Sequence, residues 1–96
     1  MEDMARAFAA LGNQRRFKIM VSLLGLREDT AGSIANTHRL HPTVASKHLK
    51  KLEVARLVRG ERRGRCVYYS AETDSSSIAI RSILSILRRS PKRRVR

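Results

Sequence analysis

Residues 30–58 read TAGSIANTHRLHPTVASKHLKKLEVARLV, and this stretch decides the fold. A proline is favoured at the first position of a helix because its missing N–H would have no partner there. Pro42 therefore marks the start of a helix that runs to about residue 54. Asp29 or Thr30 caps a shorter helix before it, whose apolar positions are Ala31, Ile34 and Ala35. Two short helices joined by a tight turn predict a helix-turn-helix.

The helix at 42–54 carries apolar and polar side chains on opposite faces. The inward positions are Val44, Ala45, His48, Leu49 and Leu52, and the outward positions are Thr43, Ser46, Lys47, Lys50 and Lys51. The major groove of B-form DNA admits one α-helix, whose donors and acceptors then reach the base edges. We therefore expect Thr43, Ser46 and Lys47, on the first turns of the helix, to read bases. Lys50 and Lys51, on its flank, are expected to bind phosphates.

A basic hairpin follows the helix-turn-helix. Residues 57–61 and 65–70 are rich in strand-forming residues and predict two strands joined across residues 62–64. Guanidinium groups bind the phosphate backbone without reading its sequence, so the arginines of this hairpin are expected to contribute affinity for DNA. These arginines are Arg59, Arg62, Arg63 and Arg65. A helix-turn-helix with such a hairpin behind it is the winged helix-turn-helix arrangement.

Two amphipathic helices are predicted before the helix-turn-helix. The first ends at Gly12, and its apolar stripe at i, i+3, i+4 and i+7 is Met4, Ala7, Phe8 and Leu11. The second starts after an Asn13 cap and ends at Gly25, and its inward face is predicted to be Phe17, Met20, Val21 and Leu24.

A last amphipathic helix follows the hairpin. It starts near residues 75–77 and ends before Pro91. Its apolar stripe is Ile80, Ile83, Leu84 and Leu87, widened by Ile78 and Ile86. A stripe this apolar is expected to be covered by a second copy of the chain. Residues 91–96 are basic and without periodicity, so we expect one domain over residues 1–90 and a basic tail after it.

The charge of the chain indicates a polyanionic partner. Its 96 residues include 21 lysines and arginines against 8 acidic residues, which gives a net charge of +13. Self-repulsion at this charge is hard to explain without a neutralising ligand, and double-stranded DNA is the ligand that fits the helix pattern. No secretory signal or membrane span is visible, so a cytoplasmic protein without a membrane partner is expected. A single cysteine excludes an intramolecular disulfide and indicates a reducing compartment.

The chain resembles the ArsR-type repressors. Three segments carry the resemblance, and they read ALGNQRRFKIM at 10–20, the stretch at 30–58 quoted above and RGERRGRCVYYS at 59–70. The resemblance spans residues 8–70 and implies a mainly α fold of five helices with a small two-stranded β wing. It also implies a sequence-specific DNA-binding repressor that dimerises through its first and last helices. The residues expected at that interface are Met4, Phe8, Ile80, Ile83, Leu84 and Leu87.

Many proteins of this type sense metals, but this sequence departs from their ligand pattern. Thr30 and Gly32 stand where the resemblance places a Cys-x-Cys pair, and neither can ligate a metal through a thiolate. Asp74 is the one plausible ligand in the region of the last helix, where the other positions are Thr73, Ser75, Ile86 and Arg89. We therefore expect no metal site and no cofactor.

The histidines and the cysteine leave two alternatives open. His38, His41 and His48 fall around the turn and two turns into the next helix, so they are not expected to converge on one ion. Cys66 follows Arg65, a setting in which a thiol can be reactive, but it has no resolving cysteine. A sensor of metal or redox state with its ligand site elsewhere is one alternative, although we identify no small-molecule effector. A basic protein that coats nucleic acid without specificity is the other. No catalytic constellation is visible, so we do not expect an enzyme.

Overall fold

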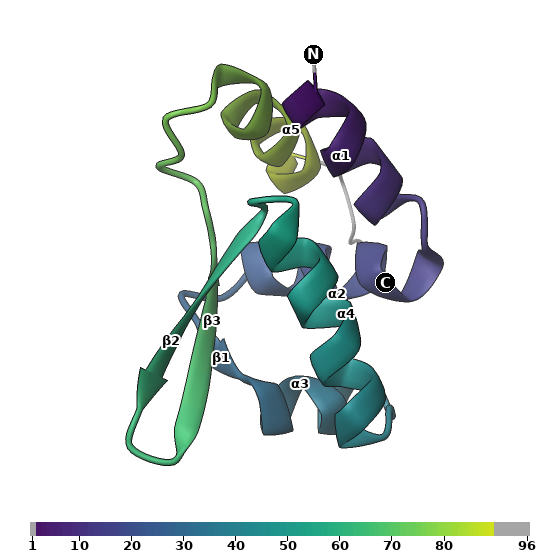
Figure 1. Ribbon diagram of the computed structural model, residues 1–96, viewed down its shortest axis with the longest axis vertical. Coiled ribbons are helices and arrows are strands. Elements are labelled where there is room, and N and C mark those ends of the chain that lie inside the picture. Colours follow the sequence, from purple (N-terminus) through teal and green to yellow (C-terminus); the bar gives the residue numbers. More distant parts are fainter. Residues whose placement is uncertain (1, 90–96) are drawn as a thin grey trace.

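Five α-helices and three short strands make up the described part of the chain, residues 2–89 of the computed structural model (Figure 1). The helices are α1 (Glu2–Leu11), α2 (Gln14–Leu24), α3 (Ala31–Thr37), α4 (Pro42–Val54) and α5 (Ile78–Arg89). The strands are β1 (Asp29–Thr30), β2 (Val58–Arg63) and β3 (Cys66–Ala71). The predicted winged helix-turn-helix is confirmed. The predicted basic tail at 91–96 lies outside the described residues.

The predicted helix starts are also confirmed. The Asn13 side chain accepts a hydrogen bond from the backbone N–H of Arg16 at 3.0 Å and so caps α2. Of the two candidates before α3, Thr30 is the cap, because its hydroxyl accepts from the N–H of Ser33 at 3.1 Å. The Asp29 carboxylate instead accepts from the N–H of Thr30 at 2.9 Å, which leaves the cap position to the threonine.

The turns after α3 and α4 place an arginine where a glycine is usual. Arg39 and Arg56 have φ angles of 55° and 64°, in the left-handed region that costs an L-residue about 1–2 kcal/mol. Each turn closes with a hydrogen bond across five residues, from Leu40 to the Ala35 carbonyl and from Leu57 to the Leu52 carbonyl. These bonds are those of the Schellman motif, which satisfies carbonyls at a helix end.

The strands form one antiparallel sheet in the order β1-β3-β2. The sequence predicts that the first strand of the hairpin ends at residue 61 and that the second begins at 65. In the structure β2 continues through Arg63, and the turn is Gly64-Arg65. Gly64 has a φ of +63°, as the first residue of a type II′ turn requires. The strand β1 was not predicted, because two residues are too few to show a periodicity.

The core lies between the four longer helices and the base of the hairpin. Its largest fully buried side chains are Ile19, Met20, Leu23, Leu49, Leu52, Leu57, Val58, Ile80 and Leu84. The predicted inward face of α2 was partly wrong, because Phe17 is 40% exposed while Ile19 and Leu23 are buried. Helix α2 contacts α1, α4, α5 and β3, so it is covered on more than one side. A prediction that assumes a single buried face therefore selects partly different residues.

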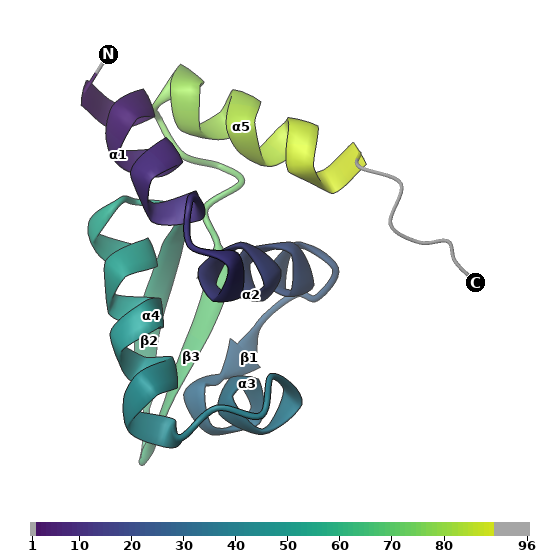
Figure 2. The same ribbon diagram turned by 90° about the vertical axis from the view of Figure 1, so that its right-hand side faces the viewer.

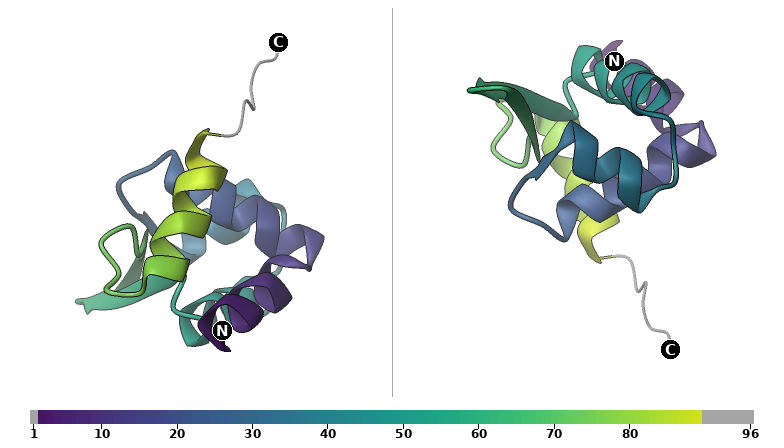
Figure 3. Two further views of the ribbon diagram at one scale, coloured as in Figure 1. Left: turned by 90° about the horizontal axis from the view of Figure 1, so that it is seen from above. Right: turned by 90° about the horizontal axis from the view of Figure 1, so that it is seen from below.

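The two ends of the molecule are built from different elements. Helices α1 and α5 lie together at one end, whereas α3, the N-terminal end of α4 and the tip of the hairpin lie at the other (Figure 2). Figure 3 views the molecule from these two ends. Within residues 2–89, none of the helices has the length and the apolar run needed to cross a bilayer.

Candidate nucleic-acid interface

The outward face of α4 is a continuous exposed stripe. Thr43, Ser46, Lys47 and Lys50 are spaced i, i+3, i+4 and i+7, so they share one face of the helix, and all four are exposed. Lys51 is exposed beside them. The opposite face is buried through Ala45, Leu49 and Leu52. The structure therefore brings the predicted base-reading and phosphate-binding residues of this helix together on one surface.

Proline and histidine fix the start of α4. Pro42 is the first helical residue, and the Nδ1 atom of His41 accepts a hydrogen bond from the backbone N–H of Thr43 at 3.1 Å. His41 thus serves as an N-cap, which the sequence interpretation did not assign to it. One further correction concerns Val44, which was predicted to face the interior but is 37% exposed.

The hairpin does not present its arginines as one surface. All four of the candidates Arg59, Arg62, Arg63 and Arg65 are exposed. Side chains alternate along a strand, so Arg59 and Arg63 lie on one face of β2 and Arg62 lies on the other, while Arg65 is in the turn.

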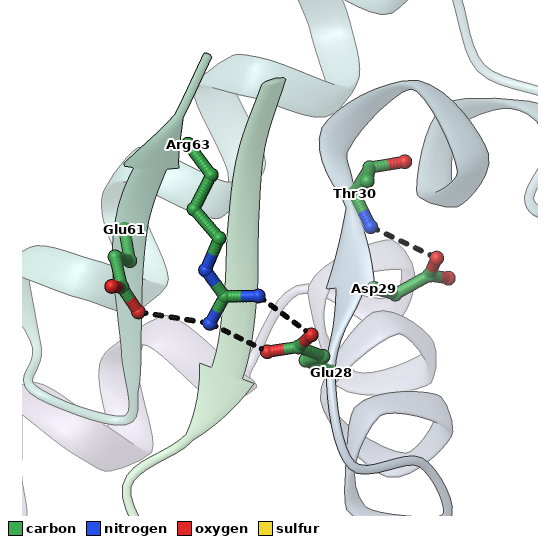
Figure 4. Close-up of polar contacts among 5 residues, drawn as sticks. All are labelled: Glu28, Asp29, Thr30, Glu61 and Arg63. Atoms are coloured by element: carbon green, nitrogen blue, oxygen red, sulfur yellow. Dashed lines mark hydrogen bonds and ion pairs between the residues drawn. The ribbon is translucent and has the colours of Figure 1, made fainter. Parts of the chain in front are cut away.

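Arg63 is held by two carboxylates (Figure 4). Its Nη1 and Nη2 atoms donate to the two oxygens of Glu28 at 2.8 and 3.0 Å, and Nη2 also donates to Glu61 at 3.0 Å. Its guanidinium lies 4.6 Å from the ring centroid of Tyr68. The hydrogen bonds from Arg63 hold the pKa of Glu28 below its usual range, and the same bonds raise the pKa of Arg63. Among the nine candidate DNA-binding residues, all of which are described, only Arg63 forms an ion pair with another residue of the described chain.

Arg16 of α2 contacts both α1 and α4 and so links three helices. Its Nε atom donates to the Ala10 carbonyl at 2.8 Å, and its Nη1 atom lies 3.3 Å from Nδ1 of His48. A guanidinium can only donate, so Nδ1 is the acceptor and the neutral imidazole carries its proton on Nε2. Burial and the nearby Arg16 charge both lower the pKa of His48, which favours this neutral form. His48, which the sequence predicts to face inward, thus has a partner in Arg16 that the sequence did not reveal.

The three histidines do not converge on one site. The rings of His41 and His48 are engaged in the contacts just described, and His38 ends α3. Over residues 2–89, no group of three or more histidine, cysteine, aspartate or glutamate side chains is arranged to hold a metal ion. Cys66 is exposed at the start of β3, next to the turn of the hairpin.

One exposed cation near α4 was missed by the sequence interpretation. Arg39 lies in the turn between α3 and α4 and has the positive φ described above. Strained residues of this kind persist only where the surrounding structure holds them, and they are common at functional sites. The sequence signal is an arginine in a helix-turn-helix turn at a position that glycine occupies more easily.

The residues predicted for a dimer interface divide into two groups. Ile80, Ile83 and Leu84 are 0%, 7% and 1% exposed, so they belong to the core of the chain itself. The stripe of α5 packs on α1 and α2 of the same chain, which is why it does not face outward. Leu87 is partly buried beside this core, whereas Met4 and Phe8 are 37% and 57% exposed.

A neighbouring apolar surface remains exposed at the same end of the molecule. Phe8 of α1, Phe17 of α2 and Ile86 of α5 are 57%, 40% and 65% exposed. They border a shallow groove of about 290 Å³ whose other lining residues are Leu11, Gly12, Ile83 and Leu87. We call this groove and its rim the apolar end face.

Comparison with known proteins places the chain in a recognised group. Residues 13–59 match the sequence pattern of bacterial regulatory proteins of the arsR family. The chain is 33% identical over 94 residues to the HTH-type transcriptional regulator YdfF of Bacillus subtilis. That match covers 98% of this chain and 40% of YdfF, so the chain spans less than half of this relative.

Two solved structures are similar over most of both chains. NolR from Sinorhizobium fredii is 34% identical, with a TM-score of 0.70 over 90% of this chain and 81% of NolR. The homodimeric winged helix-turn-helix DNA-binding domain of Mb0332 from Mycobacterium bovis is 27% identical. It has a TM-score of 0.74 over 90% of this chain and 75% of that domain.

Proposed function

This chain belongs to the arsR family of bacterial regulatory proteins, and from this premise we propose that it is a sequence-specific DNA-binding transcriptional repressor. The observation that carries the proposal is the exposed stripe on α4 formed by the polar and cationic residues Thr43, Ser46, Lys47 and Lys50, on a helix that contacts the basic hairpin. Donors of this kind on one helix suit the base edges and phosphates of a major groove.

In the proposed complex, the N-terminal half of α4 enters the major groove. Thr43, Ser46 and Lys47 lie on its first two turns and read base edges through hydroxyl and ammonium groups. Lys50 and Lys51, further along the helix, neutralise the phosphates that border the groove.

The hairpin supplies further phosphate contacts. Arg59, Arg62 and Arg65 are exposed and have no ion-pair partner among the described residues, so their charges are available to a phosphate. Arg39, in the turn before α4, is a fourth candidate. Each phosphate contact adds about one unit to the dependence of affinity on salt, so these residues contribute affinity and not sequence preference.

We propose that the protein binds as a homodimer through the apolar end face. The support is that large aromatic and aliphatic side chains are exposed there, next to helices whose own stripes are already buried. The homodimeric domain of Mb0332 is similar to this chain over most of its length. A two-fold dimer places two copies of α4 for two half-sites of a palindromic operator, about 34–36 Å apart. The revised interface keeps Phe8, Ile83 and Leu87 from the sequence expectation and adds Phe17 and Ile86.

We further propose that repression needs neither catalysis nor a bound metal. A dimer on its operator blocks other proteins from the same DNA, so occupancy is sufficient for repression.

The DNA of a bacterium lies in the cytoplasm, which is therefore the proposed location. No residue in the described chain gives a specific reason to add an effector, and DNA binding is expected to be insensitive to Zn²⁺ at stoichiometric concentration.

Selection of bound duplexes from random DNA tests this function. A repressor of this kind enriches a palindrome whose half-sites are one helical turn apart. Enrichment of no sequence, with uniform coating of all duplexes, would instead support a basic protein that binds nucleic acid without specificity.

A further inference from the structure

The contacts of Arg63 cross the whole sheet of the hairpin. The residue lies on β2, one edge of the sheet, whereas Glu28 directly precedes β1 at the other edge, with β3 between them. The side chain therefore passes over β3 and the ring of Tyr68 to reach a carboxylate 35 residues away in the sequence. Figure 4 shows the guanidinium between Glu61 and Glu28.

The register of the sheet explains why these groups meet. Glu61 pairs with Tyr68 across β2 and β3, and Thr30 pairs with Tyr68 across β1 and β3, so all three lie on one face. Arg63 is two residues after Glu61, and Glu28 is two residues before Thr30, and a separation of two preserves the face. Arg62 lies one residue away and is on the opposite face.

The charge of this group does not suit a phosphate contact. One guanidinium faces two carboxylates, so Arg63, Glu28 and Glu61 together are net negative, although Arg27 is a further cation near Glu28 and the chain as a whole carries +13. A phosphate would have to displace a bidentate carboxylate that accepts two hydrogen bonds from the guanidinium, at 2.8 and 3.0 Å. It would also approach Glu61, which repels it.

The hairpin packs on α2, α3 and α4, and the strand β1 joins it to the segment before α3. The strand β1 contributes two residue pairs, Asp29 with Tyr69 and Thr30 with Tyr68. Near the base, the N–H of Gly60 donates to the Glu53 carboxylate of α4 at 3.3 Å. Arg63 is the last residue of β2 and pairs with Cys66, next to the turn, so its bonds to Glu28 tie down the part of the hairpin furthest from that base.

We propose that Arg63 is a positioning residue that fixes the tip of the hairpin against the segment before β1, and that it does not itself contact DNA. The inference rests on the proposed function where it concerns DNA, and it revises the sequence expectation for this arginine. Its adjacent neighbour Arg62 keeps the role of a phosphate contact.

Charge-conserving variants separate positioning from phosphate binding. Arg63→Lys keeps the cation, and lysine binds phosphate well as a point charge, but it cannot form the bidentate pair. We expect this variant to bind a selected operator roughly two- to fivefold more weakly, with an unchanged salt dependence. Arg62→Ala is the matched comparison and should lower the salt slope by about 1. An Arg63→Lys variant with unchanged affinity, together with an Arg63→Ala variant whose salt slope falls by about 1, would overturn the proposal.

Amide hydrogen exchange in the free protein tests the same proposal without DNA. The amides of β1 and β3 should exchange faster in Arg63→Lys and in Arg63→Glu, but not in Arg62→Ala. The exchanged pair Glu28→Arg with Arg63→Glu should recover protection relative to Arg63→Glu alone, because the two charges then attract again. Unchanged exchange in Arg63→Lys would contradict the proposal. If the wild-type chain selects no DNA sequence, the proposed function fails, and the exchange experiment still decides whether Arg63 holds the hairpin.

Discussion

Helix α4, whose N-terminal end lies opposite α5 in the molecule, and helix α5 are both amphipathic, but they leave different side chains exposed. The apolar residues Ala45, Leu49 and Leu52 of α4 are buried, and the exposed residues at 43, 46, 47, 50 and 51 are polar or cationic. Val44 and Val54 are also exposed on this helix, by 37% and 66%. The apolar residues of α5 span a wider arc than the core covers, so Ile80 and Leu84 are buried while Ile86 is 65% exposed. A hydrophobic arc wider than its own core marks a surface for another protein chain, whereas a cationic outer face marks a surface for a polyanion.

The largest expected effect concerns the buried side of α5. Leu84→Ala should lower the free energy of unfolding by about 2–5 kcal/mol, because it removes buried methyl groups and leaves a cavity. Denaturant unfolding measures this change. A loss below about 1 kcal/mol would show that Leu84 is not a core residue and that the assignment of the two sides of α5 is wrong.

Substitutions on the exposed side of α5 should weaken dimerisation and leave the stability of the fold nearly unchanged. Phe8→Ser combined with Ile86→Ser should weaken dimerisation roughly tenfold or more, because both side chains are large, exposed and apolar. At protein concentrations below the dissociation constant of the dimer, where the chain is monomeric, the midpoint of unfolding should hardly change. Sedimentation velocity over a dilution series gives the association constant. Val54→Ser is the control, because Val54 is also apolar and 66% exposed but lies on α4, outside the apolar end face. Equal association of the wild type and the double variant would place the dimer contact elsewhere.

A smaller effect is expected at the cationic end. Arg39→Gly should stabilise the fold by roughly 0.5–1 kcal/mol, since glycine adopts a positive φ without steric cost. The same change removes a proposed phosphate contact, so affinity for DNA and the salt slope should both fall, the slope by about 1. Arg56→Gly relieves the same backbone strain at the other end of α4 and is the control, with increased stability and unchanged salt slope. A loss of salt slope in both variants, or in neither, would remove Arg39 from the proposed contacts.

The smallest effect is the dependence of stability on pH. Burial and the charges of Arg16, Arg15 and Lys51 lower the pKa of His48 in the folded chain. The unfolded chain then binds more protons around the ordinary histidine pKa of about 6.5. The stability that neutral His48 contributes is therefore present above about pH 6.5, and it is lost as the pH falls through the lower pKa of His48 in the folded chain. Burial lowers the pKa of His38 as well, with the same sign. His48→Gln should therefore flatten the decline between pH 7 and 5 only in part. An unchanged pH profile in this variant would contradict the neutral His48 that accepts from Arg16.

Local patterns in the sequence were sufficient for most of the fold. The Asn13 cap and the first residue of α4, Pro42, were both predicted correctly, because a cap or a proline acts within one turn of its own position. Contacts between distant segments could not be predicted in this way. Nothing in the sequence links Arg63 to Glu28, because the pairing depends on the register of three strands.

In the candidate site, too, features that depend on local patterns could be predicted, and features that depend on contacts between distant segments could not. The outward residues of α4 follow from helical periodicity and are exposed as expected. Periodicity also identified the stripe of α5, but it could not tell which side of that stripe the same chain would cover. The packing of α1 and α2 decides this, and it places Ile83 in the core and Ile86 outside.

The most direct test of the central claim is the ratio of two affinities. The wild-type protein is titrated with its selected palindrome and with a scrambled duplex of the same length and composition, at the same salt concentration. A regulator that reads bases with α4 should bind the palindrome about 10³-fold or more tightly than the scrambled duplex. A ratio near 1 would mean that the charge of the chain alone holds the DNA and that α4 reads no sequence.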